Sequence, residues 1–471
     1  MLEIQEHSLY IFLRFEYFYI EGSDNKMAQE INVPGDFLTI QAAITAANDY
    51  DTIRVAPGTY TGPITIDKMI QLLGAQAGVD ARTRTGSPGS ESIITGTSPI
   101  ALVQLLDNNI VVDGFTIENN SAGSGILTSN AFSGYWIFNN IVQNNVIGLY
   151  MNSNGSTESQ VKQNVFNNNN QSGAATGNGI YSDQGIQNLL IESNRFTGPH
   201  ANASINMIGT SVPAIPATDI IISRNEMITD NSIALTNTGN VAIACNTLTN
   251  TQGSSIFFGG GTDRTDINNN ILQNSISNGI NVTTVFSGTT NSNIRAKNNN
   301  IQGNANAGLN IVSGAYVSPR RLDATNNWWG SPDGPSGDGP GSGDAVFDPD
   351  NVAEFVPFLT APPIPCTNEF VLLQLLAATQ QELAATQQEL AATQQELAAT
   401  QQQLAATQRA LALAQQRSLA CRRALALAQQ QLEKCQAELR QKRINENLKE
   451  NMRCFKCGSN PCVCCNPCEC C

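Results

Sequence analysis

An asparagine recurs through the middle of the chain at intervals of 24, 30, 31, 21, 24, 29 and 27 residues. Two residues after each of these asparagines stands an apolar side chain, such as Val142, Phe166 or Leu248. A repeat of this length indicates a solenoid, in which each coil buries its apolar side against its neighbours. The unequal intervals indicate a constant inner coil with loops of variable length. The repeated residues are Asn140, Asn164, Asn194, Asn225, Asn246, Asn270, Asn299 and Asn326.

Asparagine suits the turns of such a coil because it tolerates left-handed backbone angles and hydrogen-bonds locally. Stacked in successive coils, the amides can bond one another along the solenoid axis, as in cross-β ladders. A second motif, a small residue followed by an aliphatic one, recurs within the coils, for example at Gly148-Leu149 and Gly179-Ile180. Disorder is disfavoured because the apolar residues keep a fixed register with the asparagines. The sequence therefore predicts a mainly β solenoid over residues 31–360, with the eight asparagines as a ladder.

The residues before the repeat change from a helical to a strand pattern. Ile40 and Ile44 fall at helical spacing, whereas Ile53 and Val55 alternate as strand residues do. The order of a short helix, TIRVAPGTY and ITIDK resembles the N-terminal cap of right-handed parallel β-helix proteins of the pectin-lyase-like superfamily. The resemblance implies a right-handed parallel β-helix whose first coil is covered by the helix, which protects an exposed sheet edge.

The end of the solenoid is marked by ATNNWWGSPDGPSGDGPGSGD at residues 324–344. This segment resembles the closing coil, rich in Asn, Trp and Gly, of many bacterial β-helix repeat proteins. We expect Trp328 and Trp329 to cover the last coil and residues 346–359 to supply a final strand. The proline-rich residues 361–370 are expected to form a stiff, extended linker.

Beyond the linker, residues 371–445 repeat every seven residues around LAATQQE. A heptad leucine stripe predicts a coiled-coil stalk, because a lone helix would leave the stripe exposed. The few charges favour a parallel homo-oligomer, and analogy with other β-helix fibres favours a trimer. The leucines are Leu376, Leu383, Leu390, Leu397, Leu404, Leu411, Leu425, Leu432 and Leu439.

Eight of the 12 cysteines lie in the tail, residues 446–471. Three interpretations are open: a zinc site, a metallothionein-like metal cluster, and covalent cross-linking. Cross-linking is favoured because the vicinal cysteines and nearby prolines suit bonds to other chains better than a compact fold, and no cofactor is then required. The expected cross-linking residues are Cys421, Cys435, Cys454, Cys457, Cys462, Cys464, Cys465, Cys468, Cys470 and Cys471.

Charge and hydropathy limit the partners. The formal net charge is -14, which disfavours nucleic acid and anionic membranes as partners because phosphate binding needs a basic surface. No run of 18 apolar residues occurs, so no membrane span is expected. Residues 1–30 are interpreted as an N-terminal extension without a secretory signal, and Met27 as the true start.

A catalytic site is not evident. The enzymes of the resembled superfamily include lyases, polygalacturonases, epimerases and esterases. No matching set of their catalytic motifs is found, so a role other than catalysis is favoured. His200 is expected in a loop. A carboxylate pair could form from Asp263 and Asp266 beside Arg264, although solvated corner charges are favoured. The acidic segment 333–350 could bind Ca²⁺, although a Gly/Pro turn is favoured. The other acidic candidates are Asp113, Asp183, Asp219 and Asp230.

The sequence thus predicts a structural surface or appendage protein with a β-helix head, a coiled-coil stalk and a disulfide-forming tail. The cysteine-rich tail resembles those of bacterial spore outer-layer proteins, which implies attachment to cysteine-rich surface proteins of the coat or exosporium. The alternative is a carbohydrate-binding or polysaccharide-cleaving β-helix protein, tailspike-like or lyase-like, whose glycan would lie along the long face of the solenoid.

Overall fold

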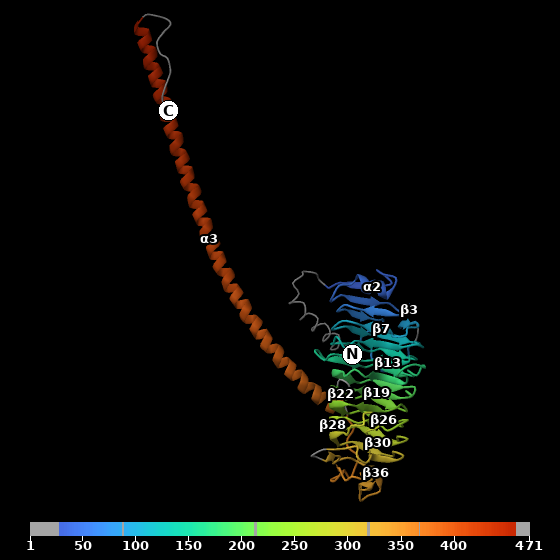
Figure 1. Cartoon of the computed structure of the whole chain (residues 1–471). Coiled ribbons are helices and arrows are strands. Elements are labelled where there is room, and N and C mark those ends of the chain that lie inside the picture. The colour runs from blue at the N-terminus through green and yellow to red at the C-terminus, as the bar shows by residue number, and fades with distance from the viewer. Residues whose placement is uncertain (1–27, 87–88, 212–213, 318–320, 367, 458–471) are drawn as a thin grey trace. The chain divides into compact units, whose positions relative to one another are not determined.

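A computed structural model describes residues 28–86, 89–211, 214–317, 321–366 and 368–457. The chain divides into two compact units, residues Met1–Asn368 and Glu369–Cys471. The first unit, here called the head, is a stack of short-stranded coils, and the second contains a single long helix (Figure 1).

The coils of the head place their strands in three parallel sheets, which the chain visits in the repeating order A, B, C. This arrangement is a parallel β-helix, as the sequence predicted. Within the described residues, sheet A contains β1 (Glu30–Val33), β2 (Thr52–Val55), β5 (Gln71–Leu73), β8 (Val111–Asp113), β11 (Trp136–Phe138), β14 (Ser159–Lys162), β17 (Gln187–Glu192), β22 (Ala217–Ser223), β25 (Thr238–Ala244), β28 (Asp263–Asn268), β31 (Ser292–Lys297), β34 (Leu322–Asp323) and β37 (Ala353–Glu354).

Sheets B and C complete each coil. Sheet B contains β3 (Gly58–Thr61), β6 (Ser92–Thr95), β9 (Phe115–Glu118), β12 (Ile141–Gln143), β15 (Val165–Asn167), β18 (Arg195–Thr197), β23 (Glu226–Ile228), β26 (Thr247–Thr249), β29 (Ile271–Gln273) and β32 (Asn300–Gln302). Sheet C contains β4 (Ile64–Ile66), β7 (Ala101–Leu105), β10 (Ser124–Thr128), β13 (Ile147–Tyr150), β16 (Asn178–Ser182), β19 (Ala203–Ile208), β24 (Ile233–Thr236), β27 (Ile256–Phe258), β30 (Asn278–Val282), β33 (Ala307–Ile311), β36 (Gly343–Phe347) and β35 (Pro335–Gly337). An antiparallel hairpin, β20 (Thr210–Ser211) and β21 (Ala214–Ile215), and a 3₁₀ helix, η1 (Ala81–Thr83), lie outside the three sheets.

One continuous apolar core fills the coils from Ile31 to Ala353. Alternate strand residues point inward and stack on their equivalents in the next coil, as Phe166 does on Phe196 with ring centroids 5.2 Å apart. Because no single coil can bury its apolar side alone, the stacking of coils supplies the core.

The turn between sheets A and B carries the asparagine ladder. Its first residue takes a left-handed conformation, as at Arg224 (φ 56), and its second is a buried asparagine, as at Asn225. The Oδ1 atom of Asn225 accepts hydrogen bonds from the backbone N–H of Asn194 (2.9 Å) and from its Nδ2 (3.0 Å). The Nδ2 of Asn225 donates to the Ile191 carbonyl (3.0 Å) and to Oδ1 of Asn246 (3.0 Å). Each amide therefore satisfies buried backbone groups and joins two coils.

The structure places seven of the eight predicted asparagines in this ladder, from Asn140 to Asn299. The prediction that the eighth, Asn326, belongs to the ladder was wrong. Asn299 donates from its backbone to Oδ1 of Asn327 (2.9 Å), whereas Asn326 takes the left-handed position with φ 57. In the doublet Asn326-Asn327 both residues suit a turn, so the choice between them depends on which amide lies toward the core.

Both ends of the solenoid are covered by apolar side chains. Helix α2 (Ile40–Ala46) begins after the Thr39 cap, whose hydroxyl accepts from the Ala42 N–H, and it buries Ile40 and Ile44. At the other end Trp329 is fully buried, and Trp328 donates from Nε1 to Gln302 (2.8 Å). These features agree with the expected cap helix and closing tryptophans.

The segment expected as a simple spacer is tied to the side of the head. Cys366 forms a disulfide with Cys245, which lies in the A–B turn between β25 and β26. Residues 357–366 run back from the final coil, since the Asn326 N–H donates to the Pro357 carbonyl and the Leu359 N–H to the Asn327 carbonyl. The bridge spans 121 residues, and by loop closure alone it restricts the unfolded chain by about 4–5 kcal/mol. The sequence analysis did not identify this pair.

The second unit is helix α3 (Asn368–Cys457), which is longer than the predicted stalk and includes residues 446–457 of the predicted tail. Leu390, Leu397 and Leu404 are 57–58% exposed on this helix. The hydroxyls of Thr400 and Thr407 donate to the carbonyls of Glu396 and Gln403, one turn earlier. Within the described residues, no helix is long and apolar enough to cross a membrane.

The ladder generates a stability prediction. Asn225→Ala should lower the free energy of unfolding of the head by about 3–5 kcal/mol, because it leaves several buried backbone and amide groups without partners. The matched control is Asn306→Ala, since Asn306 is exposed and should change stability by less than about 0.5 kcal/mol. Urea unfolding followed by circular dichroism measures both. Equal losses in the two variants would contradict a structural role for the ladder.

Candidate functional site

A straight column of outward-facing side chains runs along sheet C. Strand pairing puts Tyr150 beside Tyr181, Tyr181 beside Asn206, and Ala234 beside Phe257. These side chains point outward because the residues on either side of each, such as Ile180 and Ser182, are buried. We call this set the sheet C column: Gln104, Leu127, Tyr150, Tyr181, Asn206, Ala234, Phe257, Asn281 and Asn310.

A hydrogen-bonded aromatic pair lies in this column. The rings of Tyr150 and Tyr181 have centroids 5.4 Å apart and planes tilted by 45°. Both hydroxyls donate to the Asp183 carboxylate, Tyr150 at 2.5 Å and Tyr181 at 3.2 Å, and Gln184 donates from Nε2 to the Tyr150 hydroxyl (3.1 Å). These contacts fix the two rings, so the pair forms a preorganised aromatic surface with an acceptor beside it.

The tyrosine hydroxyls stay protonated. Burial, with further contributions from Asp183, raises the pKa of Tyr150 to about 12. Burial and the charge of Asp183 raise the pKa of Tyr181 as well. Both hydroxyls therefore act as hydrogen-bond donors at neutral pH, and neither is available as a phenolate base.

A second aromatic pair lies further along the same column. Phe257 on β27 and Phe286, in the loop after β30, meet edge to face with centroids 5.7 Å apart. The loop is held by the backbone N–H of Phe286, which donates to the Gly259 carbonyl (3.0 Å). Phe286 is 72% exposed. An exposed, positioned phenylalanine offers an apolar contact to a ligand on this face.

His200 lies in the loop between β18 and β19, as expected, but its side chain is fully buried in a second ladder at this turn from sheet B to sheet C. Its Nδ1 is 2.8 Å from Asp230 Oδ2, and its Nε2 is 3.3 Å from Asn169 Nδ2. Because Asn169 can only donate from that atom, the arrangement suits a neutral imidazole that donates from Nδ1. Burial acts to raise the pKa of Asp230, but the interactions with His200 and the hydrogen bond from the Asn231 N–H together outweigh it and lower the pKa. In other coils an asparagine such as Asn145 occupies this position of the turn. His200 and Asp230 take its place, and because both are buried, neither can reach a ligand.

Asp113 is buried beneath the loop that connects β5 to β6. It accepts hydrogen bonds from Asn139 Nδ2 (2.9 Å) and the Gly78 N–H (3.1 Å). Burial raises the pKa of Asp113 to about 6, against the opposing effect of these bonds. Nearby, the enclosed ion pair Arg84–Glu91 (2.8 Å) closes the same loop onto the coils. These groups hold the loop in place and are closed to solvent.

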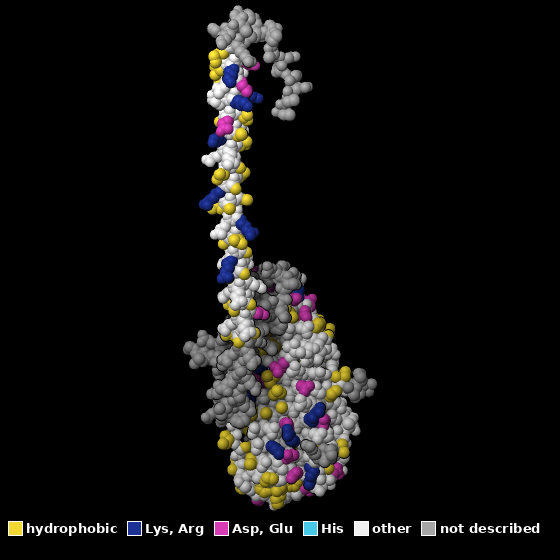
Figure 2. Space-filling model, turned by 90° about the vertical axis from the view of Figure 1, so that its left-hand side faces the viewer, with side chains coloured by type: hydrophobic (Ala, Val, Ile, Leu, Met, Phe, Trp, Pro, Cys, Tyr) yellow, Lys and Arg dark blue, Asp and Glu magenta, His cyan; other side chains and the backbone are white. Residues whose placement is uncertain are grey.

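The other acidic candidates form pairs across coils. Asp266 makes a bidentate ion pair with Arg295 of the next coil (2.5 and 2.6 Å). Asp263 accepts from Ser292 Oγ (2.7 Å), and its distance to Arg264 is 3.4 Å. The structure therefore does not join Asp263 and Asp266 into one site with Arg264. Figure 2 shows acidic and basic side chains mixed on one face of the head, as such pairing produces. Asp219 is exposed and accepts from Asn240 (2.5 Å).

Carboxylates of the acidic segment 333–350 accept hydrogen bonds from groups within the head. Asp348 accepts from the backbone N–H groups of Val352 (2.9 Å) and Ala353 (2.7 Å). Asp344 accepts from the Asn304 N–H (2.9 Å). These carboxylates organise the closing turns. Among the described residues, no group of three or more His, Cys, Asp or Glu side chains is placed to hold a metal ion.

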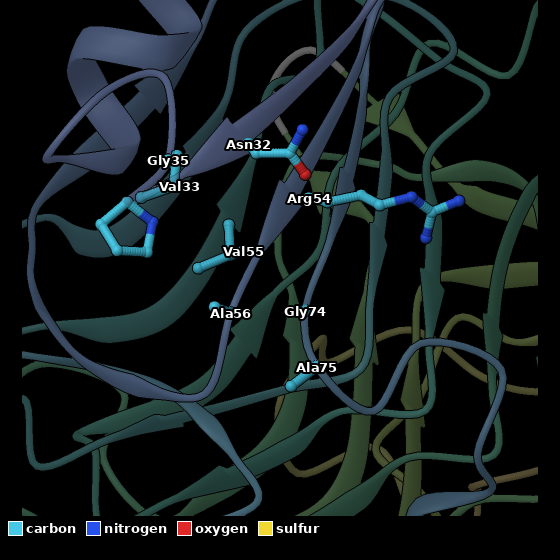
Figure 3. A pocket seen from close by; sticks show the side chains of 9 residues that line it. Asn32, Val33, Gly35, Arg54, Val55, Ala56, Gly74 and Ala75 are labelled. Carbon is cyan, nitrogen blue, oxygen red and sulfur yellow. The ribbon is translucent and has the colours of Figure 1, made fainter.

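A shallow hollow of about 320 Å³ lies at the N-terminal end of sheet A (Figure 3). Backbone turns and small side chains line it, including Val55, Ala56 and Gly74. Figure 3 shows Arg54 extending away from Val55 and Ala56, and its Nε is paired with Glu30 at 2.7 Å. The hollow offers no set of convergent polar groups, so it is a weaker candidate than the sheet C column.

The predicted cross-linking residues are only partly described. Cys421 and Cys435 are exposed, reduced side chains on α3. Cys454 and Cys457 lie in the last turns of α3, but their side chains are outside the described part. The remaining six, Cys462, Cys464, Cys465, Cys468, Cys470 and Cys471, lie outside the described residues.

The tyrosine pair was missed at the level of sequence, although a signal was present. Tyr150 and Tyr181 each follow the repeated small–aliphatic motif, in Gly148-Leu149 and Gly179-Ile180. Since Leu149 and Ile180 point into the core, the next residue in each strand must point outward. A column of outward residues could therefore have been assembled from that motif.

No protein-family model matches the chain, and no curated relative matches it by sequence. Among solved structures, it is similar to the A-module of the mannuronan C-5 epimerase AlgE6 from Azotobacter vinelandii, with a TM-score of 0.50 and 15% identity over 69% of this chain and 95% of that one. This likeness supports the parallel β-helix fold alone.

Two further structures are similar at lower scores. They are an alginate lyase from Paenibacillus sp. str. FPU-7 (TM-score 0.41, 12% identity, 56% of this chain and 93% of that one) and the Dettilon tailspike protein gp208 (TM-score 0.38, 13% identity, 64% of this chain and 69% of that one).

Asp113 generates a pH prediction. Its pKa is raised in the folded state, so its favourable contribution is complete below about pH 4 and is lost as the pH rises through about 6. As the pH rises from 4 to 7.5, the free energy of unfolding of Asp113→Asn should therefore increase by about 2–3 kcal/mol relative to that of the wild type. Urea unfolding across this range measures the difference. Asp219→Asn is the control for the loss of one acidic group, and an Asp113→Asn curve parallel to the wild type would contradict the assignment.

Proposed function

We propose that the head is a binding module for a polysaccharide chain, which lies along the sheet C column. The observation that carries this proposal is the alignment of Tyr150, Tyr181 and Phe257 on one row of parallel strands, with Phe286 packed on Phe257 from the loop after β30. The half-buried amide side chains of Asn281 and Asn310 share this row, whereas that of Asn206 is buried. Aromatic faces pack on the apolar faces of sugar rings, and amides bond their hydroxyl groups.

The regular spacing of the coils supports a polymeric ligand. Tyr181 and Phe257 are three strands apart, which corresponds to roughly 14 Å at about 4.7 Å per strand. Between them stand Asn206 and the small side chain of Ala234. A short run of sugar units can therefore contact both aromatic pairs at once, whereas a single sugar can contact only one.

The arrangement supports binding rather than cleavage. The carboxylate of Asp183 is engaged by two tyrosine hydroxyls, and both tyrosines hold their protons at neutral pH. General acid–base catalysis needs a group that exchanges a proton with the substrate near the working pH. Histidine is a common general acid or base in enzymes, but His200 is buried away from the column.

Helix α3 supports a second part of the proposal, that several heads are joined in a fibre. Apolar side chains recur along the helix (Figure 2), and the heptad leucines whose side chains are described, from Leu390 to Leu439, are more than half exposed. The Thr400 and Thr407 hydroxyls bond within the helix, so these residues can enter a seam with their donors satisfied. We propose a parallel homo-oligomer, with a trimer favoured, in which multiple heads bind one polymer by avidity.

The exposed thiols of Cys421 and Cys435 support covalent joining of the helices, because equivalent residues face one another in a parallel bundle. The cysteine-rich tail would then attach the fibre to cysteine-rich surface-layer proteins. We propose the bacterial surface or the spore outer layer as its location, on the grounds of this cysteine content.

Loss of an aromatic ring tests the binding role. Tyr181→Ala and Phe257→Ala should each weaken polysaccharide binding about five- to tenfold, since an aromatic contact contributes on the order of 1 kcal/mol. Affinity electrophoresis of the full chain in gels containing polysaccharide measures the retention. Ile221→Ala, an exposed change on sheet A, is the control. Unchanged retention in both aromatic variants would refute the assignment of the column.

The stalk is tested by oligomeric mass. Replacing Leu390, Leu397 and Leu404 together by Asn should dissociate the fibre into single chains, because each amide disrupts the apolar seam. Sedimentation velocity under reducing conditions gives the mass. A triple variant that keeps the mass of the wild type would place the interface elsewhere.

A further inference from the structure

We propose that the sheet C column selects uncharged polysaccharides and discriminates against polyuronates. This inference rests on the binding role proposed above and specifies the chemical class of its ligand. Its basis is the distribution of charge over the head. Every described lysine and arginine of the head lies away from the outward column, and an acidic side chain lies within the binding face.

The described cations are on other parts of the coil. Five stand on strands of sheet A, one stands on sheet B, one stands on η1, and the others lie in turns or loops. They are Arg54, Lys162, Arg264, Arg295 and Lys297 on sheet A, Arg195 on sheet B, Arg82 on η1, and Lys68, Arg84, Arg224 and Arg321 in turns or loops.

Each of these cations is already engaged. Nine form ion pairs with acidic residues within the head, such as Lys297 with Asp323 (2.6 Å) and Arg195 with Glu226 (2.8 Å). Lys68 donates to three carbonyls at the end of α2, including that of Ala47 (2.6 Å). Arg321 donates to Asn351 (2.6 Å). A bound uronate on sheet C would therefore find no described cation to pair with.

The charge on the binding face has the opposite sign. Asp183 lies beside the tyrosine pair, where its carboxylate accepts both hydroxyls. The surrounding chain is acidic too, with 14 Lys and Arg against 34 Asp and Glu over residues 1–408. A carboxylate on each sugar would meet repulsion at the aromatic pair, whereas sugar hydroxyls can donate to Asp183 and to the amide oxygens of the column.

The sharpest test uses polymers that differ only in charge. Alginate and polygalacturonate are each compared with their carboxyl-reduced forms, and dextran, xylan and chitin oligosaccharides extend the neutral set. Affinity electrophoresis of the full chain gives the retention, and oligosaccharide competition measures the chitin series. We expect each carboxyl-reduced polymer to be retained at least fivefold more strongly than its parent. The difference should narrow in high salt, because salt screens the repulsion.

A charge substitution tests the cause. Asn281→Lys and, on the next strand, Asn310→Lys each add a cation to the column and should raise retention by alginate and polygalacturonate at least threefold. Ile221→Lys adds the same charge to an exposed position on sheet A and is the matched control. Circular dichroism confirms that each variant is folded. If one of the two lysine variants fails to fold, the other still provides the test.

The outcomes separate the two proposals. Stronger retention by either native uronate than by its reduced form overturns the inference about charge while leaving polysaccharide binding intact. An equal gain in the Ile221→Lys control also overturns it, because the effect would then be one of net charge. Absence of retention by every polymer, charged and neutral, overturns the binding role itself.

Discussion

From Asn140 to Asn327, one buried asparagine in each coil joins that coil to its neighbours by hydrogen bonds. Each amide in the A–B turn accepts from the backbone of the preceding coil and donates to its own ladder neighbour, as Asn225 does between Asn194 and Asn246. Without the amide these backbone groups would be buried and unpaired. Because the bonds occur at the same place in successive coils, they fix the register of all three sheets, while the opposite loops remain variable in length.

The proposed binding face depends on that register. Tyr150, Tyr181 and Phe257 come from different coils, yet strand pairing places them in one straight row. A slip of one residue in any strand would turn its outward side chain into the core. His200 and Asp230 bond in the second ladder in the same structural way, so this histidine supports the backbone and lies buried away from the sheet C column.

The repeat, the cap helix and the closing tryptophans were predictable because each depends on local spacing and on burial. The choice between Asn326 and Asn327 was not, because both residues suit the turn and only the core decides between them. The Cys245–Cys366 bridge could not be inferred either, since its two residues are 121 apart and their approach depends on the path of residues 357–366. The tyrosine pair lay within reach, because the residue after each small–aliphatic motif must point outward.

Hydrogen exchange measured by mass spectrometry, with and without the neutral polysaccharide that is retained most strongly, tests the location of the binding face most directly. The account predicts slower exchange in peptides that cover residues 147–151, 178–184 and 283–288, which carry the aromatic pairs and their loops. Peptides from sheet A, such as residues 263–268 and 292–297, should exchange at unchanged rates. Protection confined to sheet A, or absent from sheet C, would contradict the account.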